Sequence, residues 1–126
     1  MKKVTVGWFE IPVKEMDRAL AFYQKVFDCQ LQLMDMGDFQ MAMFPGEGGG
    51  QGAEGSLVFH KDFYEPSSLA GTLIYFVSED VSIELARVEE AGGTVQISKR
   101  MISPDYGFMG VFLDSEGNRI GLHSMK

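Results

Sequence analysis

Few residues of this 126-residue chain stand where they could do acid–base or nucleophilic chemistry. The two histidines, His60 and His123, lie near the ends of β-like runs, and Glu10 interrupts an otherwise apolar run. A carboxylate and an imidazole are common partners in proton transfer. The single cysteine, Cys29, has no basic neighbour in the sequence, and no Ser–His–Asp or HExxH spacing occurs. These residue types therefore favour proton transfer or ligand orientation over nucleophilic catalysis.

The elements that must position these residues follow a repeated pattern. Residues 4–13 are apolar, β-branched and aromatic, which predicts a strand, and residues 16–27 place apolar side chains at helical spacing. A weaker copy begins about 64 residues later, with Ser82 as the predicted helix N-cap and Gly92-Gly93 as its end. Further strands are predicted over residues 31–35, 39–44, 55–60, 72–77, 94–98, 108–113 and 119–124.

The order strand, helix, three strands thus occurs twice, which predicts an α+β fold. We expect one domain over residues 1–126, with module one at about 1–62, module two at about 70–126 and a polar linker between them. Since side chains alternate along a strand, one face of each first strand should pack on the helices. Those residues are Phe9, Ile11 and Val13 in module one, and Leu73, Tyr75 and Val77 in module two.

The composition of the chain disfavours several classes of binding partner. The net charge of −7 disfavours nucleic acid and anionic membranes, because both need a positive surface. No apolar run is long enough to span a membrane, and the first residues lead straight into a strand pattern. A single cysteine excludes an internal disulfide framework. We therefore expect a cytoplasmic protein. The glycine-rich segment 45–52 matches no phosphate-binding motif and is either a surface loop or a lid.

Three segments carry a family resemblance. They are Trp-Phe-Glu-Ile-Pro-Val at 8–13 with Arg-Ala-Leu-Ala-Phe-Tyr at 18–23, Ala-Gly-Gly at 91–93, and the closing stretch 107–122 with Asp-Ser-Glu-Gly-Asn between two strands. This pattern resembles the glyoxalase/bleomycin-resistance/extradiol-dioxygenase superfamily, also called vicinal oxygen chelate proteins. The resemblance implies paired βαβββ modules, curved mixed sheets around a U-shaped cavity, helices on the convex side and, often, a homodimer.

The resemblance also implies where a metal would bind, with one ligand from each of four strands. These positions fall on Trp8, Thr72, Gly121 and a residue between Glu54 and Val58. Tryptophan and glycine side chains cannot ligate a divalent ion, and threonine is a poor ligand. Such a site needs three or four nitrogen or oxygen donors. We therefore expect no divalent metal and no other cofactor.

Glu10 and His123 could replace the metal-ligating side chains that these positions lack. By alternation Glu10 shares a face with Trp8, and His123 shares one with Gly121, so both are expected to point into the implied cavity. They could form a catalytic acid–base or ligand-orienting pair, with His60 joining them, or a shifted metal site. They could equally hydrogen-bond to each other or to the backbone at the cavity rim.

The implied cavity has an aromatic, largely apolar lining, which is typical of small-molecule pockets. The candidate ligand-binding residues are Trp8, Thr72, Ile74, Phe76, His60 and Tyr106. The favoured function is binding of a small, partly apolar molecule without the family's usual metal. One alternative is a lyase, isomerase or dioxygenase that uses Glu10 and His123, with or without a divalent metal. Another is an interaction module whose cavity is filled by side chains.

Overall fold

The computed structural model describes residues 2–47 and 52–126, so the predicted loop or lid over 45–52 lies partly outside the described residues. The elements are β1 (Trp8–Pro12), α1 (Met16–Phe27), β2 (Gln32–Asp35), β3 (Phe39–Met43), β4 (Glu54–His60), β5 (Tyr75–Val77), α2 (Val81–Ala91), β6 (Thr94–Ser103), β7 (Gly107–Leu113) and β8 (Arg119–Ser124). This order confirms the predicted α+β fold, with strand, helix and three strands occurring twice.

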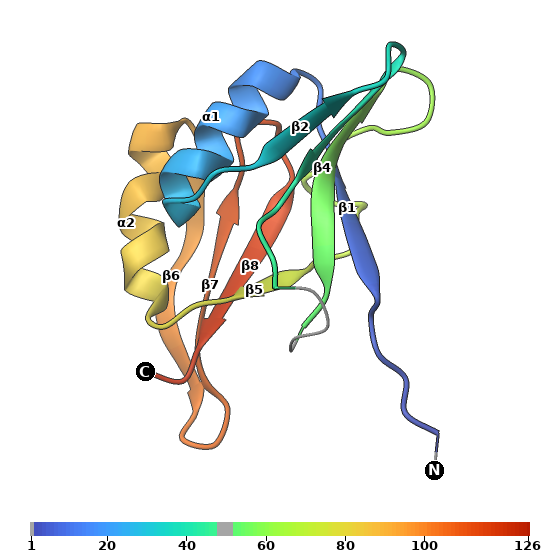
Figure 1. Ribbon diagram of the computed structural model, residues 1–126. Helices are drawn as coiled ribbons and strands as arrows, with labels where there is room; N and C mark the ends of the chain where they lie inside the picture. The colour runs from blue at the N-terminus through green and yellow to red at the C-terminus, as the bar shows by residue number, and fades with distance from the viewer. Residues whose placement is uncertain (1, 48–51) are drawn as a thin grey trace.

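Each half forms one four-stranded mixed sheet, and the two sheets have the same topology. The first sheet has the order β1-β4-β3-β2 and the second has the order β5-β8-β7-β6. In both, the first strand pairs in parallel with the fourth, and the remaining pairs are antiparallel. Figure 1 shows α1 and α2 lying next to each other on one side of the strands. The two sheets therefore bury their helix-facing sides in a common core.

The core is one cluster built from both halves. Its fully buried side chains include Phe22 and Tyr23 of α1, Val88 of α2, Leu57 of β4 and Phe112 of β7. Both helices are amphipathic, and burial of their apolar faces drives this packing. Within residues 2–47 and 52–126, no helix is long and apolar enough to cross a membrane.

The ends of α2 confirm one predicted signal and correct another. Gly92 ends the helix in the left-handed conformation with φ of 109°, as predicted. The predicted N-cap at Ser82 is wrong, because the helix begins at Val81 and Asp80 precedes it. The extended backbone of Asp80 lets its carboxylate accept the Ser82 N–H at 3.0 Å, which is what an N-cap side chain does.

The predicted faces hold for β1 but are reversed in β5. Ile74 and Phe76 pack on the core, whereas Tyr75 and Val77 are 48% and 87% exposed. Phe9, Ile11 and Val13 do pack inward. Equivalent core positions of the two halves are 65 residues apart, not 64: Ile11 with Phe76, Met16 with Val81, and Tyr23 with Val88. A shift of one residue turns every strand side chain to the opposite face, and this caused the error.

A polar cluster in the β7–β8 turn joins the two halves. Glu116 Oε1 accepts the backbone N–H groups of Lys14 and Glu15 at 2.8 Å each, and Arg18 Nε donates to Oε2 at 2.7 Å. Burial raises the pKa of Glu116, but the Arg18 hydrogen bonds and these N–H groups outweigh it and lower the pKa to about 2. The turn thereby satisfies free N–H groups at the start of α1.

Two more side chains of this turn complete the cluster. Asp114 accepts the Tyr23 hydroxyl at 2.6 Å, and Asn118 Nδ2 donates to the Pro12 carbonyl oxygen at 2.7 Å. Burial raises the pKa of both Asp114 and Tyr23. We call Asp114, Glu116 and Asn118 the β7–β8 clamp. The closing Asp-Ser-Glu-Gly-Asn motif therefore serves to hold module two onto module one.

Candidate functional site

A broad hollow lies on the face of the second sheet that points away from the core. It has a volume of about 710 Å³. Its lining is Tyr75 and Val77 of β5, Arg100, Met101 and Ile102 of β6, Tyr106 of the β6–β7 turn, Met109 of β7 and His123 of β8. Several of these apolar side chains are exposed, among them Tyr106 at 70%. An exposed apolar hollow with a few polar groups is typical of a ligand or partner site.

Two polar side chains in the lining, His123 and Arg100, can orient a bound molecule. His123 Nε2 hydrogen-bonds to the carbonyl oxygen of Tyr106, which can only accept. The proton of a neutral His123 ring therefore lies on Nε2, and Nδ1 is an acceptor. Arg100 adds a permanent positive charge to the same lining. A ligand with one oxygen-rich edge and one planar apolar face fits this combination.

Gly121 has a packing role at the implied metal position of the last strand. A Cβ atom at residue 121 would lie 2.5, 2.6 and 2.9 Å from three ring atoms of Tyr75. The Tyr75 ring thus occupies the space that a ligating side chain at 121 would need. The parallel register, which pairs Tyr75 with Gly121, places the ring there.

Trp8 and Thr72, at two of the other implied metal positions, have surroundings of a different kind. Trp8 donates its indole N–H to Glu10, and Thr72 lies in the connection before β5. In the part of the chain that the structure describes, no three His, Cys, Asp or Glu side chains are grouped to hold an ion. The donor set that the resemblance implies is therefore not assembled by these residues.

Four of the predicted ligand-binding or catalytic residues line a second cavity. Trp8, Glu10, Thr72 and Ile74 surround about 420 Å³ between β1, the connection before β5 and the start of β8. Glu10 uses both carboxylate oxygens, one for the Trp8 indole N–H at 3.3 Å and one for the Tyr64 hydroxyl. The hydrogen bond to Glu10 raises the pKa of Tyr64. Glu10 therefore orders the wall of this cavity.

The predicted pairing of Glu10 with His123 does not occur within the described residues of one chain. Glu10 lies on the first sheet and lines the 420 Å³ cavity, whereas His123 lies on the second sheet and lines the 710 Å³ hollow. His60 lines a third cavity, where its Nδ1 accepts the Asp62 N–H at 3.1 Å. Phe76 faces the core and lines a fourth cavity. Tyr106 does line the hollow, together with His123.

Most of the residues that line the 710 Å³ hollow were not predicted from the sequence as site residues. Tyr75 and Val77 were assigned to the core face, and alignment of the two helix starts would have given the correct 65-residue offset. Arg100, Met101 and Ile102 lie in the part of β6 beyond the predicted strand end at residue 98. Register shifts interrupt β6 there, so simple alternation of polar and apolar residues is lost.

The chain is thus built from two halves of the same topology, each a four-stranded mixed sheet with one helix. The sequence pattern of the Glyoxalase/Bleomycin resistance protein/Dioxygenase superfamily matches residues 5–122. The chain therefore belongs to that superfamily. A comparison with curated proteins gave no match.

Solved structures share the fold. Glyoxalase I of Zea mays superposes with a TM-score of 0.70 at 16% identity, over 94% of this chain and 45% of the maize chain. This chain thus spans less than half of that enzyme. TnmS3, an antibiotic binding protein from Streptomyces sp. CB03234, superposes with a TM-score of 0.68 at 26% identity, over 98% of both chains. A glyoxalase/bleomycin resistance protein from the same strain gives 0.65 at 26% identity, over 94% of this chain and 98% of that one.

Proposed function

We propose that this chain is a cytoplasmic protein that binds a small, partly apolar molecule in the 710 Å³ hollow, without a divalent metal. The hollow itself carries the proposal, because it presents two tyrosine rings beside one guanidinium and one imidazole. The similarity to TnmS3, an antibiotic binding protein, supports it. A planar, antibiotic-like molecule with an oxygen acceptor for Arg100 and a hydroxyl donor for His123 Nδ1 has the matching chemistry.

The side chains that line the hollow explain how a ligand would bind there. The Tyr75 ring rests on Gly121 and is therefore held in place before a ligand arrives, which limits the entropy lost on binding. Tyr106 offers a second ring at the mouth. A ligand that covers about 200 Å² of this apolar surface gains about 5 kcal/mol before its own ordering costs. Arg100 and the Nδ1 atom of His123 then set its orientation.

A homodimer is part of this proposal. The first sheet exposes Leu33 and Met34, and the second exposes Val77, Met101 and Ile102. Exposed apolar side chains of this kind favour an interface with another molecule. A second copy of the chain could bury them if its first sheet packed against the hollow. Sedimentation should show a dimer that Val77→Glu dissociates. A monomeric wild-type protein at high concentration would remove the dimer from the proposal.

Ligand binding is tested by calorimetry with bleomycin and with a planar aromatic antibiotic. We expect one ligand per hollow, and a loss of about tenfold or more in affinity for Tyr106→Ala, because stacked aromatic contacts are lost. Tyr64→Phe, which changes a tyrosine outside the hollow, is the matched control and should bind normally. Equal affinity in Tyr106→Ala and wild type would contradict the assignment of the hollow.

The metal is tested separately. Elemental analysis after dialysis should find no stoichiometric divalent ion, and a chelator should leave antibiotic affinity unchanged. One tightly held ion per chain, lost together with binding on chelation, would overturn the metal-independent proposal.

A further inference from the structure

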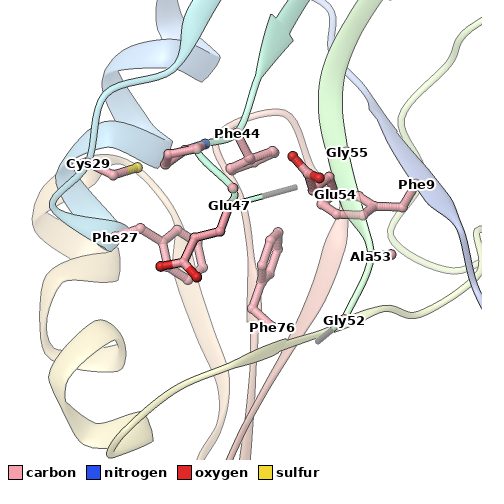
Figure 2. A pocket seen from close by; sticks show the side chains of 12 residues that line it. Phe9, Phe27, Cys29, Phe44, Glu47, Gly52, Ala53, Glu54, Gly55 and Phe76 are labelled. Atoms are coloured by element: carbon pink, nitrogen blue, oxygen red, sulfur yellow. The ribbon is translucent and has the colours of Figure 1, made fainter. Parts of the chain in front are cut away.

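A separate aromatic cavity of about 440 Å³ lies at the C-terminal end of α1 (Figure 2). Four phenylalanines form its wall: Phe9 of β1, Phe27 of α1, Phe44 after β3 and Phe76 of β5. Phe76 is central, since its ring centroid lies 5.5 Å from Phe9, 4.7 Å from Phe27 and 5.4 Å from Phe44. Each ring is half-buried and packs on the core. The wall is therefore pre-formed.

Gly55 shows how closely this wall is fitted. A Cβ atom at residue 55 would lie 2.4 to 2.5 Å from the Phe9 ring and its carbonyl oxygen. The Phe9 ring therefore lies directly over the glycine, and any side chain there would push it out of position. The side chain of Glu54, the residue before it, lies against Gly46, and both residues belong to the lining.

The charges at this cavity have one sign. The carboxylates of Glu47 and Glu54 belong to its lining and lie at the edge of the ring cluster in Figure 2. Among the described lining residues there is no lysine, arginine or histidine. The chain as a whole carries −7, which adds to the attraction for cations. An aromatic wall and two carboxylates together favour a positively charged, apolar molecule.

We propose that this cavity binds a small hydrophobic cation, an ammonium carried on an aromatic or aliphatic group. The apolar part packs on the phenylalanine rings, and the ammonium lies between them and the carboxylates of Glu47 and Glu54. The 440 Å³ and 710 Å³ cavities have no lining residue in common. The cation site is therefore independent of the proposed antibiotic-like ligand.

Calorimetry with two probes of equal shape tests the charge preference. Naphthylmethyl-trimethylammonium should bind once per chain, about tenfold or more tightly than naphthylmethanesulfonate, and the difference should shrink at high salt. The double variant Glu47→Gln/Glu54→Gln should reduce cation affinity to the level of the sulfonate. Glu65→Gln, which lies outside this cavity, is the matched control and should bind like wild type. Equal binding of both probes, or unchanged cation affinity in the double variant, would overturn the proposal.

Cys29 reports where the cation binds. It is the chain's single cysteine and lines this cavity. Burial, with Asp28 as a second cause, raises the pKa of its thiol, so alkylation is slow enough to follow. The ammonium probe should slow alkylation several-fold, and the sulfonate should not. Tyr106→Ala should keep this protection, which separates the site from the hollow. Cation binding without protection of Cys29 would also overturn the proposal.

Discussion

Glu116 of the β7–β8 clamp offers the sharpest test of how the two halves are held together. Its carboxylate is buried and accepts two backbone N–H groups and the Arg18 guanidinium. Glu116→Gln keeps the shape but removes the negative charge and turns an N–H donor toward other donors. We expect this substitution to destabilise the fold strongly at neutral pH.

The magnitude follows from the pKa. A carboxyl whose pKa falls from 4.5 to about 2 on folding stabilises the protein by about 3 kcal/mol at pH 7. Because the pKa is lowered in the folded state, this contribution is complete above pH 4.5 and is lost as the pH falls toward 2. Linkage with these two values leaves about 1.4 kcal/mol at pH 3. Glutamine does not titrate, so the gap between wild type and variant should narrow in that window.

Urea unfolding at pH 7, 4.5 and 3 measures this gap. Glu90→Gln is the matched control, because Glu90 pairs with Lys25 but its side chain is 75% exposed. Exposed pairs contribute little, so the control should change little at any pH. A Glu116→Gln gap that is below 1 kcal/mol at pH 7, or that is the same at pH 7 and pH 3, would refute the reasoning.

Three further substitutions test the packing. Tyr23→Phe removes a hydroxyl donor from the β7–β8 clamp and should lower the unfolding free energy in urea by about 1 to 3 kcal/mol; an unchanged value would mean that water replaces it. Gly121→Ala should cost about 1 to 3 kcal/mol through collision with Tyr75, and a double-mutant cycle with Tyr75→Ala should recover part of that loss. Asp80→Ala should lower the Tm at pH 7 but not at pH 2. Hydrogen bonds from Ser82 and then Lys99 hold the Asp80 pKa at about 2, so their contribution to stability is lost between pH 3.8 and 2. A Tm difference that persists at pH 2 would contradict this.

The order of helices and strands could be predicted from the sequence because each half repeats the same local sequence patterns. The apolar face of residues 16–27 and the glycine at 92 fix helix positions without tertiary information. The family resemblance rested on residues that turn out to be structural, namely Tyr23 and the β7–β8 clamp. Such residues are recognisable in sequence because their hydrogen bonds demand specific side chains.

The candidate site was less predictable, because it depends on which way side chains point. An error of one residue in the repeat placed Tyr75 on the core face of β5 and Phe76 on the face that forms the 710 Å³ hollow, the reverse of the structure. The separation of Glu10 from His123 could not be read locally either, because it depends on how two sheets meet. The irregular second part of β6 carried no alternating pattern that would have predicted Arg100 in the lining.

The β7–β8 clamp has a consequence for assembly. It joins module two to the start of α1, and the Phe76 ring likewise packs on rings from module one. None of these contacts depends on both halves belonging to one polypeptide, only on the reach of the segment between β4 and β5. When that segment extends, the halves of two chains can be exchanged with these contacts preserved, and refolding at high concentration should then yield domain-swapped dimers.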